Sequence, residues 1–343
     1  MRSNEYSSVI GIALAILAGM GAHPGQSARA TIVSTNYTIS EIATGDLPTS
    51  GLVVVGDAIF FGVGAFGGAS QSVVRIDSLG ATTIATGFNS LAGFDYDAVN
   101  DRLLVGDNAL EAPGSNTGDN IYSIPDPLGP VSGPVPLAED LAVLLDGDIP
   151  GVADLALDPN DPNTLYVSDA NFPAGRIVKV DLALASLVVL QSGLVKIAAG
   201  VAVDDDSLFF GLIEPFPGIG GEVSVVSLPG TGSISTLVDG LLGQFDLTFA
   251  DDGTLLGSSS QFGGSSEVVR IDPLTGEILE VVASGFDFAT AIAESAGIVY
   301  AIEGGFAPQP RILVFTPVPE PSTLLCLAAG LGALGLGRRQ SRA

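Results

Sequence analysis

The chain has 343 residues, of which 12 are basic and 38 acidic, and its formal net charge is −26. Five basic and two acidic residues lie in the terminal segments 1–30 and 317–343. The body between them therefore keeps 7 basic and 36 acidic residues, a charge of about −29. Such a body repels phosphate backbones and anionic headgroups, which argues against nucleic acid partners and against electrostatic binding to a membrane surface. Hydrophobic residues make up 47% of the chain, enough to bury a core.

The residue types that are missing from the body restrict the enzyme classes. The single cysteine is Cys326 in the C-terminal segment, the single histidine is His23 near the N-terminus, and tryptophan is absent. Ser-His-Asp and Cys-His catalysis both need a histidine base, and a quinone-cofactor dehydrogenase would be expected to stack its cofactor on tryptophan. Disulfides and cysteine metal ligands are excluded from the body as well.

The N-terminal 30 residues have the organisation of an export signal. Arg2 opens a short polar stretch, residues 9–21 form an apolar run, and Ala28-Arg29-Ala30 supplies a small-x-small cleavage pattern. The apolar run is shorter than the roughly 20 residues that a membrane-spanning helix needs. We therefore predict a signal peptide over residues 1–30 with cleavage after Ala30, rather than a permanent anchor.

The C-terminal 27 residues carry a second signal. Pro319-Glu320-Pro321 precedes an apolar stretch that ends at Gly337, and Arg338 and Arg339 follow at once. This order resembles the PEP-CTERM sorting signal, which implies an exosortase-type membrane protease in a Gram-negative exopolysaccharide producer. It also implies a body held outside the cell, with the arginines cytoplasmic. Residues 322–337 would span about 24 Å as a helix, which suits a temporary anchor that is later cut. An ordinary membrane anchor is the alternative, but it leaves Pro-Glu-Pro unexplained.

The body repeats itself with a period of about 45 residues. Each unit has four short apolar strands, with an Asp/Asn/Gly turn after the first and a Gly/Pro-rich loop after the second. The first strands are predicted to start near Leu52, Phe94, Leu155, Val201, Leu247 and Ile292, at spacings of 42, 61, 46, 46 and 45 residues. The third strands repeat most clearly, as residues 73–77, 177–181 and 268–272, with weaker counterparts at 121–124, 223–226 and 312–315.

Four strands at this period predict an all-β fold, a six-bladed β-propeller over residues 31–316 with few helices. The sixth unit lacks a fourth strand, and a strand-like segment stands alone at residues 37–43. We expect that N-terminal segment to complete the last blade beside residues 312–315, which would leave no long open edge. The pattern resembles propellers of the NHL or lactonase-like kind. A pair of β-sandwiches is the alternative, although it does not require the period.

Carboxylates stand at the predicted channel mouth, where first strands begin and second strands end. These are Asp107, Asp154, Asp169, Asp246 and Glu303. Clustered oxygens suit Ca²⁺, which makes it the one candidate cofactor and these residues the candidate metal ligands. No ligand-spacing motif is present, and Asp at a strand end commonly accepts backbone hydrogen bonds instead.

The loops after the second strands share a large apolar residue next to glycine or proline. These residues are Phe66, Leu110, Phe172, Phe216, Phe262 and Phe306. They can pack between blades as ordinary core, or the phenylalanines can form an exposed ring that receives a sugar or a peptide.

Together these features predict an exported surface or matrix-associated binding or scaffold protein, sorted by its tail. Its expected partners are the sorting protease, an extracellular polysaccharide or a surface protein, and the membrane through the tail before processing. A calcium-dependent lactonase-like hydrolase on the same propeller face is the alternative, and only the placement of the carboxylates supports it. No catalytic residues can be assigned.

Overall fold

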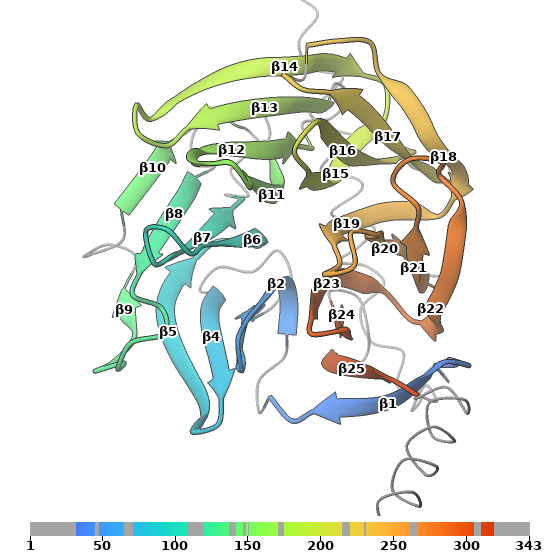
Figure 1. Ribbon diagram of the computed structural model, residues 1–343. Helices are drawn as coiled ribbons and strands as arrows, with labels where there is room; N and C mark the ends of the chain where they lie inside the picture. Colours follow the sequence, from blue (N-terminus) through green and yellow to red (C-terminus); the bar gives the residue numbers. More distant parts are fainter. Residues whose placement is uncertain are drawn as a thin grey trace, which may run out of the picture.

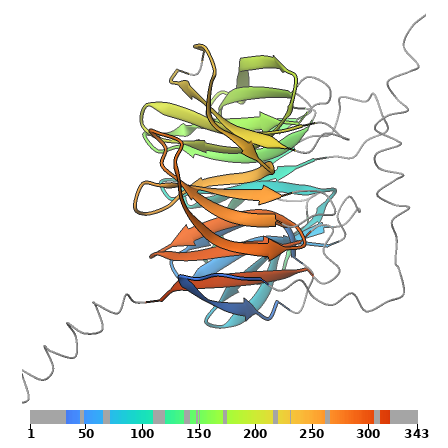
Figure 2. The ribbon, with the colours of Figure 1, turned by 90° about the vertical axis from the view of Figure 1, so that its right-hand side faces the viewer.

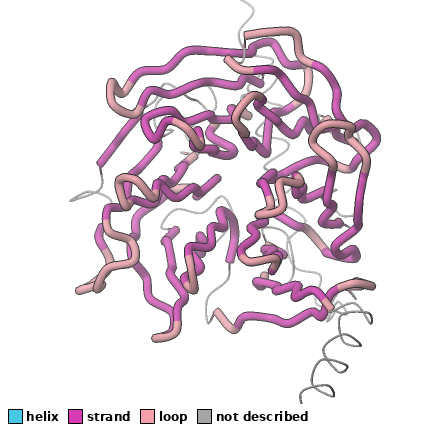
Figure 3. The backbone as a smooth tube through the Cα atoms, viewed as in Figure 1, coloured by secondary structure: helices cyan, strands magenta, loops and turns pink. Residues whose placement is uncertain are grey.

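The computed structural model describes residues 32–44, 48–64, 71–108, 120–136, 142–146, 149, 151–170, 175–214, 220–229, 231–260, 266–304 and 310–318. These residues form strands, turns and loops without a helix (Figure 3). Among them, accordingly, no helix is long and apolar enough to cross a bilayer. The strands form six sheets arranged around a central axis, as the sequence period predicts (Figure 1).

The first three blades follow one another along the chain, except that β9 joins blade 1 and β10 completes blade 2, and their strands are named from the channel outward. Blade 1 contains β2 (Pro48–Val55), β3 (Ala58–Val63), β4 (Gln71–Asp77), β5 (Gly80–Phe88) and the short β9 (Val135–Pro136). Blade 2 contains β6 (Leu91–Asp97), β7 (Arg102–Asp107), β8 (Asn120–Pro125) and β10 (Ala142–Asp146). Blade 3 contains β11 (Val152–Asp158), β12 (Asp161–Asp169), β13 (Gly175–Asp181) and β14 (Ser186–Leu194).

The last three blades follow the same plan, and the ring closes in the sixth. Blade 4 contains β15 (Ile197–Val203), β16 (Ser207–Ile213), β17 (Gly221–Ser227) and β18 (Ser235–Leu241). Blade 5 contains β19 (Gly243–Phe249), β20 (Leu255–Ser260), β21 (Ser266–Ile271) and β22 (Ile278–Phe286). Blade 6 contains β23 (Ala289–Ser295), β24 (Ile298–Glu303), β25 (Arg311–Pro317) and β1 (Tyr37–Ile42).

The N-terminal strand closes the ring as predicted. β1 pairs antiparallel with β25 from Tyr37↔Pro317 to Ile42↔Ile312 (Figure 1). The segment before β1 also reaches blade 5, because the backbone of Val33 exchanges two hydrogen bonds with Ser284 of β22, at 2.9 and 3.0 Å. The N-terminus therefore ties the last two blades together and covers the outer edge of blade 6.

The enlarged second unit is explained by a crossover between two blades. The chain leaves β8, and β9 pairs in parallel with β5 at the rim of blade 1 before the chain returns to β10. Arg75 of β4 holds this excursion, because its Nη1 donates to the carbonyl oxygens of Pro127 and Gly129, both at 2.8 Å. The 61-residue spacing between the second and third first strands is therefore explained by this segment, which leaves blade 2 to pair with blade 1.

The hydrophobic core of the described residues lies between neighbouring blades. It divides into six clusters, each shared by two adjacent blades and including the pair of blades 6 and 1. Between blades 5 and 6, for example, Phe286 packs edge-to-face on Phe315 with ring centroids 5.8 Å apart. Because a single blade cannot bury both of its faces, the closed ring is the unit of stability.

The propeller has two faces. The mouth face is the one where inner strands begin and second strands end. The turn face is opposite, and it carries the turns from first to second strand and from third to fourth strand. In the edge-on view of Figure 2, β25 (red) ends at the left, on the turn face.

Candidate functional site at the channel mouth

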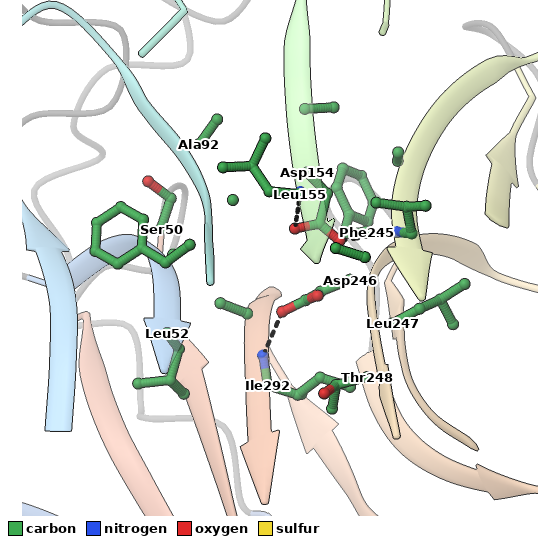
Figure 4. A pocket seen from close by; sticks show the side chains of 18 of the residues that line it. Ser50, Leu52, Ala92, Asp154, Leu155, Phe245, Asp246, Leu247, Thr248 and Ile292 are labelled. Atoms are coloured by element: carbon green, nitrogen blue, oxygen red, sulfur yellow. Dashed lines mark hydrogen bonds between the residues drawn. The ribbon is translucent and has the colours of Figure 1, made fainter. Parts of the chain in front are cut away.

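A cavity of about 650 Å³ occupies the channel. Its wall comes from the inner strands of all six blades (Figure 4). The lining extends along most of the length of these strands, and residues just after second strands, such as Asn108 and Ala170, line its end at the mouth face. The lining is mostly apolar, and none of its residues is basic. Its carboxyl groups are Asp95, Asp154, Asp246 and Glu294.

Each inner strand has a break in register near the same repeat position. In blades 3, 5 and 6 it falls immediately before Asp154, Asp246 and Ala291. The other blades have glycine there, namely Gly51, Gly93 and Gly200. Inner strands therefore begin three or four residues earlier than predicted, because the bulge interrupts the alternation from which the starts were predicted.

The glycines at this position let neighbouring blades approach one another. A Cβ atom on Gly200 would lie 2.7 Å from the carbonyl carbon of Asp246, and one on Gly93 would collide with Asp154. Blade 4 therefore lies close enough to blade 5 for side chains of blades 3 and 5 to meet across it.

Asp154 and Asp246 both bind the backbone of the next blade. Oδ2 of Asp154 accepts the amide of Val201 at 2.8 Å, and Oδ2 of Asp246 accepts the amide of Ile292 at 2.7 Å. Oδ1 of Asp154 also accepts the amide of Leu155 at 2.9 Å. A bulge frees amides that must find another partner, and these carboxyl groups supply it.

The two carboxyl groups lie near each other in the channel, although they come from blades 3 and 5 (Figure 4). They also hydrogen-bond to each other. Burial raises the pKa of Asp154 well above its usual value, and the neighbouring charge of Asp246 raises it further. Burial raises the pKa of Asp246 to about 7. Since two adjacent buried carboxylates repel each other, the pair holds a shared proton near neutral pH.

Asp95 is a third carboxyl group in the channel, and it lies two residues further along the repeat than Asp154 and Asp246. It accepts the amide of Leu157 in blade 3 at 2.6 Å and the amide of Tyr96 at 2.7 Å. Burial raises its pKa to about 6. The sequence analysis did not single out Asp95. The repeat alignment could have shown it, since its counterparts are Ala156, Ala202 and Thr248.

Asp169 and Glu303 end the second strands of blades 3 and 6, and each is paired with arginine. Asp169 Oδ2 lies 2.6 Å from Arg176 Nη2, and Glu303 Oε2 lies 2.6 Å from Arg311 Nε. Both carboxylates are almost fully buried, so the arginines at the starts of the third strands neutralise charges that would otherwise be costly.

Asp107 has the corresponding position in blade 2, but Asn120 stands across from it. Its Oδ1 accepts the amides of Asn89 and Ser90 at 2.9 and 2.8 Å. Burial raises the pKa of this carboxyl group. Asp107 therefore caps the connection between blades 1 and 2.

The five predicted metal ligands do not form one cluster. Asp154 and Asp246 meet, whereas Asp107, Asp169 and Glu303 are engaged at their own strand ends. Within the described part of the chain, no three His, Cys, Asp or Glu side chains are placed to hold a metal ion. The repeat places these five residues at a similar level along the channel axis, but this does not bring their side chains together. Asp107 instead binds backbone amides beside it, and Asp169 and Glu303 bind arginines beside them.

The predicted apolar ring cannot be placed. Phe66, Leu110, Phe172, Phe216, Phe262 and Phe306 lie outside the described residues. The structure shows another aromatic group at the mouth that the sequence analysis missed. Phe245 and Phe288 both line the cavity and pack edge-to-face, with centroids 4.7 Å apart at 65°.

Comparison with known protein families identifies the C-terminal segment. Residues 317–342 match the family model described as the PEP-CTERM protein-sorting motif. The tail is a PEP-CTERM signal. Such a signal implies export, processing by exosortase and sorting to the cell surface. The motif begins at Pro317, the last residue of β25, so the PEP-CTERM signal follows the propeller without a linker. Pro319, Glu320, Pro321, Arg338 and Arg339 all belong to the matched range.

Comparison with solved structures supports the propeller. The PQQ-bound aldose sugar dehydrogenase of Streptomyces coelicolor aligns with a TM-score of 0.60 and 14% identity over 85% of this chain and 99% of that one. Regucalcin of Agrobacterium tumefaciens, titled a calcium-binding protein, gives 0.59 and 11% over 83% and 94%. A luciferin-regenerating enzyme gives 0.59 and 13% over 82% and 96%. At such identities the likeness shows the fold alone. No curated protein sequence matches the chain.

Proposed function

We propose that the exported propeller is a binding protein of the cell surface or extracellular matrix. Its channel mouth receives a neutral, hydroxyl-rich ligand, such as a sugar unit of an extracellular polysaccharide. The PEP-CTERM signal supports the location, since it implies sorting to the surface.

One observation carries the proposal: the carboxyl groups at the mouth are already engaged by the protein. Asp154 and Asp246 accept backbone amides and share a proton, and Asp169 and Glu303 are neutralised by arginines. Asp154 and Asp246, which line the cavity, therefore offer a ligand neutral donor and acceptor atoms rather than a cage of free anions. Hydroxyl groups, which both donate and accept hydrogen bonds, are the natural complement of such a set.

The dimensions and the lining agree with a small organic ligand. A cavity of about 650 Å³ falls within the range of small-molecule sites, which are mostly apolar with a few polar groups. Phe245 is partly exposed at the mouth and can lie against the apolar face of a sugar ring. The loop phenylalanines Phe66, Phe172, Phe216, Phe262 and Phe306 follow second strands, whose ends lie at this face, and we include them in the proposed contact surface.

The test is a binding titration of the processed protein. Neutral oligosaccharides cut from the producer's own polysaccharide are titrated calorimetrically into wild type, Phe245→Ala and Ile278→Ser. Loss of one aromatic contact of about 1.4 kcal/mol should weaken binding about tenfold in Phe245→Ala. Ile278 lies on the outermost strand of blade 5, so its variant should bind like wild type. Equal affinities for all three proteins, or Ca²⁺-dependent hydrolysis of an added lactone, would contradict the proposal.

A further inference from the structure

The turn face carries large apolar side chains in one repeated turn. They lie in the turns from third to fourth strand, where Leu79, Leu184 and Leu274 of blades 1, 3 and 5 are 91%, 74% and 90% exposed. Single exposed leucines are ordinary on a protein surface. Three in the same turn of the repeat, on one face, form a pattern that packing inside the fold does not explain. We call them the leucine tips.

The leucine tips are held rigidly by their own turns. The amides of Leu79, Leu184 and Leu274 donate to a carboxylate at the end of the third strand, at 2.8, 2.9 and 2.8 Å. The accepting residues are Asp77, Asp181 and Asp272. A side chain of an aspartate that bonds the backbone two or three residues ahead fixes a turn. Each tip is therefore presented in a preformed shape.

The sorting tail leaves the propeller at the corresponding place in blade 6. The third strand of this blade, β25, ends at Pro317, and the amide of Val318 donates to the carbonyl oxygen of Asn36 at 2.8 Å. Val318 thus stands where the other blades turn from their third to their fourth strand, and it is 48% exposed. In blade 2 the same turn carries Leu128, which is 43% exposed. Val318, the residue from which the tail continues, therefore lies on the same face of the disc as the leucine tips.

The tail is too short to turn that face away from a membrane. Four peptide units separate Val318 from Ser322, where the inserted stretch begins, and they reach about 14 Å when fully extended. The seven residues of β25 alone span about 23 Å between the turn face and the mouth face. A chain of that reach cannot pass around the disc, so an inserted tail holds the turn face against the bilayer.

We propose that, while the tail holds the precursor in the membrane, the leucine tips insert into the interfacial layer of the lipid bilayer and the channel mouth faces outward. Apolar side chains at a bilayer surface are stabilised by leaving water. The aspartate beside each tip disfavours anionic headgroups, so the surface that fits is zwitterionic. This inference rests on the tail and the turn face, and it stands independently of any ligand at the mouth.

The experiment uses the full chain reconstituted into phosphatidylcholine vesicles. A Cys326→Ser background removes the native thiol, and a polarity-sensitive fluorophore is attached at Leu79→Cys, Leu274→Cys or Val195→Cys. Val195 is a matched control, because it is 82% exposed but lies in the connection from blade 3 to blade 4 on the mouth face. The two tip probes should shift to the blue and be quenched by lipids with a headgroup nitroxide, whereas the Val195 probe should be unaffected. Tip probes that behave like the Val195 probe would overturn the proposal.

Two further arms identify the surface that the tips contact. Adding phosphatidylglycerol should reduce quenching at the tips, and an increase would overturn the preference for a zwitterionic surface. Replacing the other two leucines by serine, in the Leu274→Cys protein, should weaken quenching at position 274, since the tips bind together. If the tip probes are shielded only when the sorting protease is present, the surface is a protein and the lipid assignment is wrong.

Discussion

At the scale of single residues, the channel carboxyl groups serve the fold first. Sequence alone left Asp154 and Asp246 open between cation ligands and caps of backbone amides. The structure shows each accepting the amide of the following blade, and shows the two sharing a hydrogen bond across blade 4. Their repeat position places both at a bulge, where amides lack a ladder partner. Because both carboxyl groups are buried next to each other, the free energy of unfolding should depend on pH.

That pair predicts a loss of stability as pH rises. The folded pKa of Asp246 is about 7 against 3.8 for an ordinary aspartate, and that of Asp154 is also raised. A group whose pKa is higher in the folded state contributes its full stabilisation of that state below pH ~4. This contribution is lost as the pH rises to about 7. The loss should amount to ~2–4 kcal/mol, because one pKa unit corresponds to about 1.4 kcal/mol.

Asp246→Asn tests this in urea unfolding at pH 5 and pH 8. Asparagine still accepts the amide of Ile292 but cannot repel Asp154, so the difference in unfolding free energy between the two pH values should shrink. Asp57→Asn, on an exposed turn, controls for the overall negative charge. An equal pH dependence in wild type and in both variants would refute the shared proton.

At the scale of elements, the ring is closed by the N-terminal segment, which lies outside the six repeat units. β1 supplies the fourth strand of blade 6, and the residues before it bind β22 of blade 5. The side chain of Ser34 adds a 2.6 Å hydrogen bond to the carbonyl oxygen of Val282. Without these contacts, β25 would be an open edge that can pair with another chain.

Deleting residues 31–45 should therefore cause aggregation. The truncated protein loses the six paired positions between β1 and β25 and the bridge to blade 5. We expect a lower melting temperature and a rise in static light scattering with concentration. The Val33→Pro variant loses only the backbone bridge to Ser284. It should unfold at a slightly lower temperature and remain monomeric. A deletion variant with unchanged melting and scattering would show that β1 is dispensable.

At the scale of the whole molecule, charge is distributed unevenly between interior and surface. All seven basic residues of the body are described, and six of them form ion pairs: Arg75, Arg102, Arg176, Lys196, Arg270 and Arg311. The seventh, Lys179, lies over the ring of Tyr166. The remaining acidic residues leave the surface strongly negative, and a high net charge of one sign disfavours self-association.

Processing at both ends is the prediction at this scale. The mature protein should begin at Thr31 and end near Pro319 to Pro321 in a host that has the sorting protease. Intact-mass measurement of the secreted protein determines both ends. A protease-deficient host should retain the tail and serves as the control. A secreted protein from the competent host that still ends at Ala343 would contradict processing.

The sequence by itself determined the C-terminal sorting signal, the blade period and the closing strand, and it predicts the N-terminal signal peptide. These are patterns of neighbouring residues, read without knowing which distant segments meet. Only the tertiary structure decided that Asp154 meets Asp246, that Asp107 stays apart from them, and that the leucine tips share a face with the departing tail. Such juxtapositions depend on the bulges, on the glycines that let blades approach, and on the direction of each strand. The sequence repeat predicts at which level along the channel axis a residue lies. Which residues of other blades it contacts depends on how the blades pack when the ring closes.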